Sequence, residues 1–170
     1  MIMTHYMELL AVNQPWNLIL FMGIPVVLAE TVAVTELYLL YTRQYQGWVR
    51  NLNRTAGLLV GIYFVGVFAY LLQGAVLPLS QSGGWRGWID VVAVGFYLLG
   101  VVPLGAIALL EVGVLGRGHD DHRKMLTHAL MVGVFLVVAH IAMIFGMMDP
   151  SLGGYQAQPV AMEQHGAHGH

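Results

Sequence analysis

Four long runs of apolar residues, separated by short polar connections, dominate the hydrophobic pattern of this chain. The runs cover residues 16–41, 56–79, 88–115 and 125–148. Each is longer than the ~20 residues that a helix needs to cross ~30 Å of hydrocarbon. Because the runs are continuous and do not alternate between apolar and polar residues, they favour helices over the strands of a barrel. The pattern therefore predicts four membrane-spanning helices.

The connections at residues 42–55, 80–87 and 116–124 are short. Short connections join antiparallel neighbours in helical bundles. The predicted fold class is therefore all-α, an integral membrane antiparallel four-helix bundle. We expect the bundle to cover residues 16–148. A short interfacial segment would precede it at 1–15, and a flexible His-rich tail would follow at 149–170.

The positions of Lys and Arg predict how the bundle is oriented. Six of the seven lie in the first and third connections, and only Arg86 lies in the second. The six are Arg43, Arg50, Arg54, Arg117, Arg123 and Lys124. Cytoplasmic connections of membrane proteins carry such an excess of basic residues. The pattern predicts a multi-pass protein of the bacterial inner (cytoplasmic) membrane, with both termini on the outer (periplasmic) side.

The composition narrows the function classes. The chain is 58% hydrophobic and only 9% charged, whereas a soluble domain carries about a quarter charged residues. This excludes a soluble enzyme and makes the lipid bilayer the expected partner. With seven basic and nine acidic residues, the chain has no excess positive charge to attract the phosphates of nucleic acid. With no cysteine, a metal site would have to use imidazole, carboxylate or other oxygen ligands.

Five ionisable residues inside the apolar runs are the candidates for chemistry: Glu30, Glu36, Glu111, His128 and His140. A charged group at mid-bilayer costs on the order of 3 kcal/mol on insertion scales, so such groups face the bundle interior and find partners. Helical periodicity places them on faces rich in small residues, which let membrane helices approach closely. We therefore expect the five to converge on one dry pocket.

Carboxylates and imidazoles from three helices suit a divalent transition metal. The leading hypothesis is an integral membrane metalloprotein in which Glu36, Glu111 and His128 bind Fe, Cu, Zn or Mn. Glu30 and His140 would be further ligands or proton carriers, and Tyr63 or Tyr70 would orient the ligands through hydrogen bonds. The pattern is compatible with redox chemistry at the metal but identifies no reaction, so it does not decide whether the protein is an enzyme.

Three alternatives use the same residues. They could form structural hydrogen bonds between helices. They could form a relay that carries protons or metal ions, in which case four helices would need a homo-oligomer or a larger membrane complex. A haem-binding electron-transfer subunit has less support, because haem proteins of this kind use histidines on different helices. Both intramembrane histidines here lie in the fourth run.

Five histidines outside the runs are weaker metal candidates. His119 and His122 precede the fourth run, next to Asp residues that could equally cap its helix. His165, His168 and His170 are spaced along the C-terminal tail. Such tracts bind Cu, Ni or Zn loosely, and a solvated tail without a ligand fits the pattern equally well.

The N-terminal part of the sequence carries one resemblance. It covers Thr4-His5-Tyr6-Met7-Glu8-Leu9-Leu10, then Asn13-Gln14-Pro15-Trp16-Asn17, then the segment from Pro25 to Leu37 with its two glutamates. This stretch resembles the start of a small four-span bacterial inner-membrane protein family of unknown function. The resemblance implies the four-span fold but no activity, cofactor or site.

Overall fold

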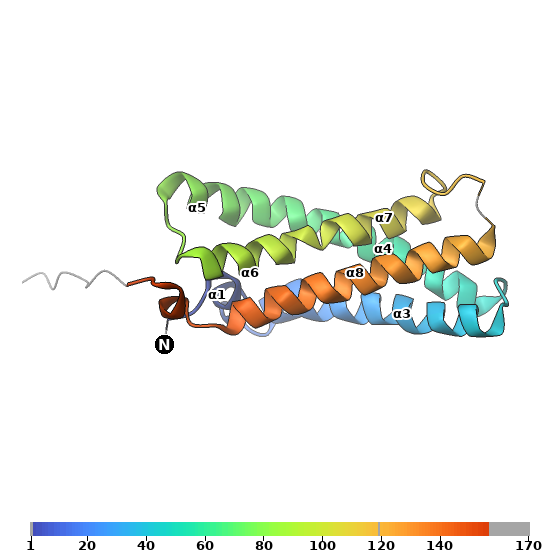
Figure 1. Ribbon diagram of the computed structural model, residues 1–170, viewed down its shortest axis with the longest axis horizontal. Coiled ribbons are helices and arrows are strands. Elements are labelled where there is room, and N and C mark those ends of the chain that lie inside the picture. Colours follow the sequence, from blue (N-terminus) through green and yellow to red (C-terminus); the bar gives the residue numbers. More distant parts are fainter. Residues whose placement is uncertain (1, 119, 157–170) are drawn as a thin grey trace, which may run out of the picture.

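Four long helical stretches make up the body of the protein. The computed structural model describes residues 2–118 and 120–156. The stretches are Trp16–Thr42, Trp48–Ser82, Trp88–Glu111 and Asp121–Met147. They lie side by side along the long axis of the molecule (Figure 1). All four are long and apolar enough to cross a membrane, as a multi-pass membrane protein requires.

Three of the four stretches contain a change in helical geometry. The first consists of α2 (Trp16–Leu18), the π-helix η1 (Ile19–Gly23) and α3 (Ile24–Thr42). The second consists of α4 (Trp48–Leu71), the π-helix η2 (Leu72–Val76) and α5 (Leu77–Ser82). The third is divided into α6 (Trp88–Leu99) and α7 (Val101–Glu111), and the fourth is the single helix α8 (Asp121–Met147).

The helix boundaries differ from the predicted runs mainly near the basic residues. The second stretch begins at Trp48, eight residues before the predicted start, and α8 begins at Asp121, four residues earlier than predicted. Arg50, Arg54, Arg123 and Lys124 therefore lie within helices and not in connections. Hydropathy places a boundary where charge begins, but long basic side chains can extend from a helix toward its polar end.

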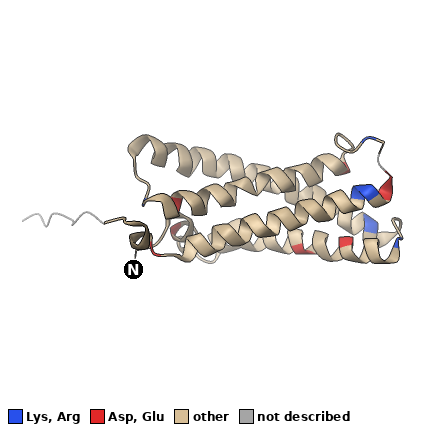
Figure 2. Ribbon diagram, in the orientation of Figure 1, with Lys and Arg blue, Asp and Glu red and all other residues tan. Residues whose placement is uncertain are grey.

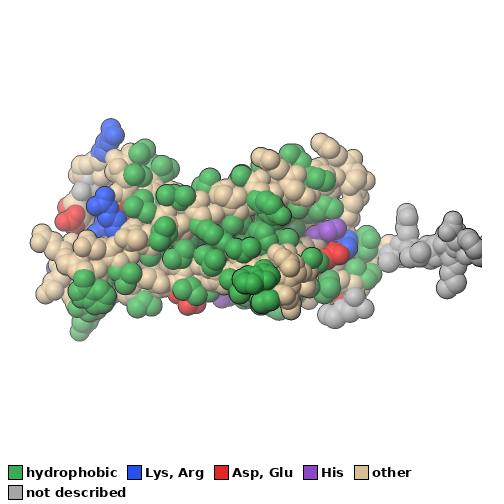
Figure 3. All heavy atoms as spheres, turned by 180° about the vertical axis from the view of Figure 1, so that it is seen from behind, with side chains coloured by type: hydrophobic (Ala, Val, Ile, Leu, Met, Phe, Trp, Pro, Cys, Tyr) green, Lys and Arg blue, Asp and Glu red, His purple; other side chains and the backbone are tan. Residues whose placement is uncertain are grey.

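A tightly packed interior joins the helices. Phe64, Leu104 and Ile107 are at most 1% exposed and lie at its centre. Gly61 allows α4 and α7 to approach closely, because a Cβ there would lie 2.5 Å from the Ala108 Cβ. The outer surface is largely apolar (Figure 3), with exposed side chains such as Leu37 and Ile62. This surface suits contact with lipid.

Pro25 in α3 changes the hydrogen bonding of the preceding turn. Proline has no N–H, so one carbonyl in the preceding turn loses its backbone donor. Two tyrosines from neighbouring helices donate hydrogen bonds to carbonyls of this π-helical turn. The Tyr97 hydroxyl donates to the Phe21 carbonyl (2.5 Å), and the Tyr63 hydroxyl donates to the Leu20 carbonyl (2.9 Å). The π-helical segment η1 is therefore held from α6 and α4.

The chain segments before and after the four stretches pack against one end of the bundle. Helix α1 (His5–Ala11) is capped by Thr4, whose hydroxyl accepts from the Met7 N–H and donates to the Gly146 carbonyl. A short 3-10 helix, η3 (Pro150–Gly153), packs on α6. The segment predicted as a flexible tail from residue 149 thus begins with a packed turn.

Basic residues gather at the opposite end of the molecule (Figure 2). The described parts of the chain connections, at 43–47, 112–118 and 120, lie there, together with the first turns of α4 and α8. We call this the basic end. It is defined by Arg43, Arg50, Arg54, Arg117, Arg123 and Lys124. The fold thereby provides a charged end beside a long apolar body.

Candidate functional site

Near the basic end, His128 lies between two carboxylates from other helices. It is fully buried in α8. Its Nδ1 lies 2.9 Å from Glu36 Oε1 of α3, and its Nε2 lies 3.2 Å from Glu111 Oε1 of α7. Glu36 and Glu111 are 1% and 4% exposed. Three residues that sequence analysis singled out are therefore brought together in one dry site.

Two cations complete this group on the side of the basic end. Arg50 of α4 donates to both oxygens of Glu111, at 2.7 and 2.8 Å. Lys124 of α8 lies 3.3 Å from Glu111 Oε2. A two-pronged Arg–carboxylate pair is a strong and directional contact. We call these five residues (Glu36, Arg50, Glu111, Lys124 and His128) the ionic cluster.

Asn53 links the ionic cluster to the backbone of α3. The Asn53 Oδ1 accepts from Arg50 (2.9 Å). Its amide nitrogen donates to the Thr35 hydroxyl (2.9 Å) and the Val32 carbonyl (3.3 Å). Asn53 is fully buried. Because its hydrogen bonds fix the position of Arg50, the guanidinium is held facing Glu111.

The hydrogen bonds of the imidazole are incomplete. The contact between His128 Nε2 and Glu111 does not have the geometry of a hydrogen bond. Among the described residues, His128 Nε2 and Glu36 Oε2 are the buried side-chain atoms without a hydrogen-bond partner. A neutral imidazole carries one N–H and one lone pair. With both carboxylates ionised, the lone pair must face one of them. One additional proton would allow both ring nitrogens to donate.

The expected metal site has little support in this geometry. Within residues 2–118 and 120–156 no group of three or more His, Cys, Asp or Glu is arranged to hold a metal ion. Both oxygens of Glu111 already accept from Arg50. A divalent cation there would also meet the positive charges of Arg50 and Lys124, which repel it. Metal binding by these residues stays a prediction.

Glu30 and His140 do not join the ionic cluster. Both are exposed on the molecular surface, and both line a separate cavity between α3 and α8. The five candidates thus divide between two places. Tyr63 donates to Leu20, and Tyr70 is 64% exposed and stacks on Phe21. Neither tyrosine is placed to orient a ligand in the ionic cluster.

The peripheral histidines have different surroundings. His122 Nδ1 lies 2.5 Å from the Tyr45 hydroxyl. Asp120 caps α8 by accepting from the Arg123 N–H, which confirms the reading of this turn as a helix cap. His119, His165, His168 and His170 lie outside the described residues, so their predicted metal binding is not addressed by the fold.

Sequence analysis did not foresee the role of Arg50 and Lys124. Both were counted as connection charges that orient the bundle. A usable signal was present, since Arg50 and Lys124 lie close to the starts of the runs 56–79 and 125–148, while the runs 16–41 and 88–115 hold acidic groups that need partners. Which acid they would meet depends on helix packing, and that is not contained in their spacing.

A second polar network at the opposite end was also missed. Asp90 is fully buried at the start of α6. It accepts from the His5 N–H (2.7 Å) and the Arg86 N–H (3.2 Å), and its Oδ2 lies 2.5 Å from His5 Nδ1. Arg86 also pairs with Glu8 at 2.7 Å. These contacts hold α1 on the bundle.

The fold and the ionic cluster define a multi-pass, all-helical membrane protein with buried protonatable groups. The chain belongs to a family of unknown function, DUF6803, whose model matches residues 1–162. This agrees with the resemblance of its N-terminal part to a small four-span family. No curated protein and no solved structure matches the chain.

Proposed function

We propose that this chain is a proton-coupled membrane protein in which the ionic cluster binds and releases one proton. In the proposed topology the four stretches are antiparallel and span the inner membrane of a bacterium. The basic end faces the cytoplasm, and both termini face outward. The concentration of Lys and Arg at one end supports this orientation.

The observation that carries the proposal is the position of His128 between Glu36 and Glu111. With a neutral imidazole, the two carboxylates and the two cations of the ionic cluster sum to zero charge. In that state one ring nitrogen lone pair faces a carboxylate oxygen. With one more proton, both nitrogens donate, but the cluster carries a net charge of +1 in a dry site, which burial penalises. Repulsion between the lone pair and the carboxylate favours binding of the proton, and the buried net charge favours its release. Neither state is strongly preferred, so the ionic cluster can bind and release one proton.

Access to the ionic cluster differs on its two sides. Toward the basic end, the Arg50 and Lys124 side chains remain 16% and 22% exposed. Toward the opposite end, Val32, Val60 and Ile107 are completely buried. Glu30, the next acidic group along α3, is about 9 Å further along the helix axis at ~1.5 Å per residue. Passage across the membrane therefore requires this apolar layer to open, so the proposed proton transfer is gated by a conformational change and is slower than in an open channel.

Proton flux into liposomes tests the proposal. Purified protein would be reconstituted with an internal pH-sensitive dye, and a potassium gradient with valinomycin would set the membrane potential. We expect the wild type to acidify the lumen faster than protein-free liposomes. Glu36→Gln and His128→Gln should each reduce the flux to the protein-free level, because neither side chain then exchanges a proton at this position. Glu8→Gln, at the opposite end of the molecule where the Glu8 side chain is 45% exposed, is the matched control and should behave as the wild type.

Two results would overturn the proposal. The first is a wild-type flux equal to that of protein-free liposomes. The second is wild-type flux in the Glu36→Gln/His128→Gln double variant. Circular dichroism and gel filtration would establish that each variant is folded. As a measurement independent of flux, infrared difference spectra between acidic and neutral pH should contain an imidazole band that His128→Gln removes.

Metal and haem binding, expected from the sequence, have separate tests. Elemental analysis of the purified wild type beside Glu111→Gln and His128→Ala would reveal a stoichiometric metal bound by these residues. An absorption spectrum with a Soret band would reveal haem. If the wild type contained a stoichiometric metal and both variants lacked it, the ionic cluster would be a metal-binding site and the proposed proton binding would be wrong.

A further inference from the structure

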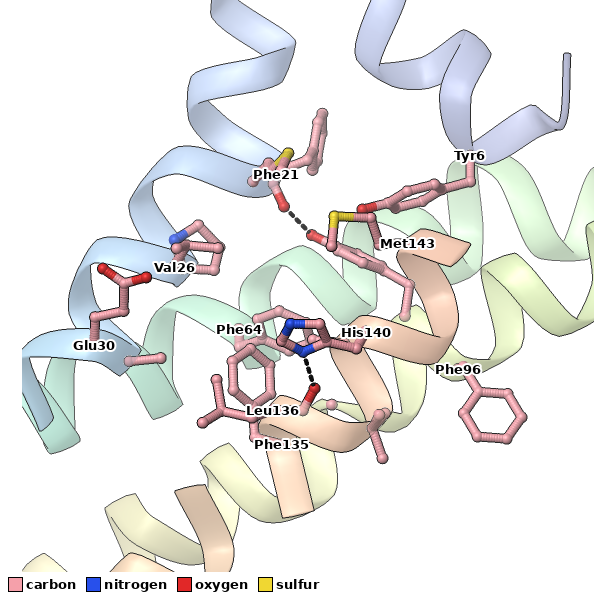
Figure 4. A pocket seen from close by; sticks show the side chains of 17 residues that line it. Tyr6, Phe21, Val26, Glu30, Phe64, Phe96, Phe135, Leu136, His140 and Met143 are labelled. Atoms are coloured by element: carbon pink, nitrogen blue, oxygen red, sulfur yellow. Dashed lines mark hydrogen bonds between the residues drawn. The ribbon is translucent and has the colours of Figure 1, made fainter. Parts of the chain in front are cut away.

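The cavity that Glu30 and His140 line is separate from the ionic cluster and lies between the first helical stretch and α8 (Figure 4). Its volume is about 230 Å³. The first stretch contributes Phe21, Met22, Pro25 and Glu30, and α8 contributes His140 and Met143 among others. Aromatic rings from other helices, including Phe64 and Tyr97, also line it. The cavity is thus an apolar, aromatic-walled space with polar groups on two facing helices.

The local backbone explains why a cavity forms here. Near the basic end, α3 and α8 are joined through the Glu36–His128 contact. Further along, Pro25 and the π-helical η1 interrupt the regular path of the first stretch. Two carbonyls of this segment accept hydrogen bonds from Tyr97 of α6 and Tyr63 of α4. The first stretch is therefore bonded to α4 and α6 at this level, and the cavity lies between it and α8 with the Tyr97 ring as part of its wall.

His140 presents one bare nitrogen at this cavity. Its Nδ1 lies 2.6 Å from the Leu136 carbonyl (Figure 4). A carbonyl only accepts hydrogen bonds, so Nδ1 carries the proton and Nε2 of the neutral ring is an acceptor. In Figure 4 this second nitrogen points away from α8, toward the side of α3. An acceptor that faces hydrocarbon without a donor is costly, so a ligand hydroxyl would satisfy it.

We propose that the cavity binds the ring of a lipid-soluble hydroquinone that enters from the bilayer. Three observations select this class. The volume is below the ~300–1,000 Å³ typical of sites for drug-sized ligands, which favours a single ring over a macrocycle such as haem. The aromatic walls favour a flat ring. Two acceptors on facing helices, His140 Nε2 and the Glu30 carboxylate, match a ring with hydroxyl groups on opposite edges.

Tetramethylhydroquinone is a suitable probe for this site. Binding to the full-length protein in nanodiscs would be measured by calorimetry, with protein-free nanodiscs correcting for partition into lipid. We expect saturable binding of the hydroquinone. The dimethyl ether of the same ring should bind at least about tenfold more weakly, because it lacks the hydroxyl donors and each lost hydrogen bond lowers affinity by about this factor.

Variants locate the site. Ala139 lines the cavity on α8, so Ala139→Phe should fill it and abolish binding. Leu130→Phe is the matched control, since Leu130 lies on the same helix with 62% of its side chain exposed, and it should bind as the wild type. His140→Phe should weaken hydroquinone binding about tenfold and leave the weak binding of the dimethyl ether unchanged.

Three outcomes would overturn the inference: absence of saturable binding by the wild type, unchanged binding in Ala139→Phe, or equal affinities for the hydroquinone and its dimethyl ether. The inference does not depend on the proposed proton function. Glu36→Gln and His128→Gln alter the ionic cluster and should leave hydroquinone binding intact, while Ala139→Phe should abolish it. The two proposals can therefore fail separately.

Discussion

Two tyrosine side chains donate hydrogen bonds to backbone carbonyls in the turn before a proline. Pro25 lies inside a helix, where it removes a donor. The structure compensates with the hydroxyl groups of Tyr97 and Tyr63, which donate to the Phe21 and Leu20 carbonyls. In a bilayer no water replaces such bonds, so a neighbouring helix must provide them. These tyrosines therefore have a structural role that hydropathy does not reveal.

Replacing Tyr97 by Phe tests this role. We expect the free energy of unfolding to fall by about 1 kcal/mol, within the ~0.6–1.7 kcal/mol found for interhelical hydrogen bonds in membranes. Unfolding in mixed micelles with increasing dodecyl sulfate, followed by circular dichroism, would measure it. Tyr70→Phe is the control, because Tyr70 is 64% exposed and its stacking on Phe21 survives the change.

A double-mutant cycle makes the test specific to the proline. In Pro25→Ala the backbone regains an N–H one turn after Phe21, so the Tyr97 hydroxyl becomes less necessary. The cost of Tyr97→Phe should be smaller in that background. An equal cost in both backgrounds would contradict the compensation.

At the scale of helices, close approach depends on small residues at particular positions. Helices α4 and α7 meet at Gly61, where an added Cβ would lie 2.5 Å from the Ala108 Cβ and 2.7 Å from the Leu104 carbonyl oxygen. Gly66, five residues further along α4, has no atom within 4 Å of such a Cβ. Two glycines of one helix thus have opposite environments.

This contrast predicts opposite effects of alanine. Gly61→Ala should destabilise the protein by about 1–3 kcal/mol, because backbone atoms of α7 must move to accommodate the methyl group. Gly66→Ala should be neutral or stabilising by up to about 1 kcal/mol, since alanine favours the helix and meets nothing. The dodecyl sulfate concentrations at which the two variants unfold would measure these effects. A Gly61→Ala midpoint equal to that of the wild type would contradict the prediction, because the packing of α4 on α7 would then not depend on this contact.

At the scale of the whole molecule, the distribution of charge supports the proposed orientation of the bundle. The basic end collects six of the seven Lys and Arg residues, whereas the other end carries α1 and η3 against the helix termini. Positive charge resists transfer across the cytoplasmic membrane. The proposed orientation follows from that asymmetry and from the even number of crossings.

The absence of cysteine from the sequence allows a direct test of this orientation. Gln44→Cys lies in the connection at the basic end, and Ser82→Cys lies at the other end of the bundle, both at exposed positions. A membrane-impermeant maleimide should label Ser82→Cys in cells whose outer membrane has been permeabilised. It should label Gln44→Cys only after the inner membrane is broken. The reverse pattern would place the basic end outside.

The structure agrees with the sequence-based predictions for features that depend on a single apolar run or a single helix face. The four stretches are recognisable because ~20 apolar residues are needed for each crossing. The meeting of Glu36, Glu111 and His128 was expected because charged groups avoid lipid. The same reasoning placed Glu30 and His140 in the same pocket, and there the structure differs. Both are exposed at a separate cavity, because on the regular helices α3 and α8 they lie about 120° around the axis and at least ~9 Å along it from Glu36 and His128, at ~100° and ~1.5 Å per residue.

The sequence by itself determined that this chain is an all-helical membrane protein with four spans, since apolar length and charge position act locally along the chain. Tertiary structure alone decided which charges pair. Arg50 and Lys124 neutralise Glu111, and His128 is left between two carboxylates. Such pairing depends on how helices that are distant in sequence rotate and approach, and electrostatic energy in a dry interior changes steeply over a few ångströms.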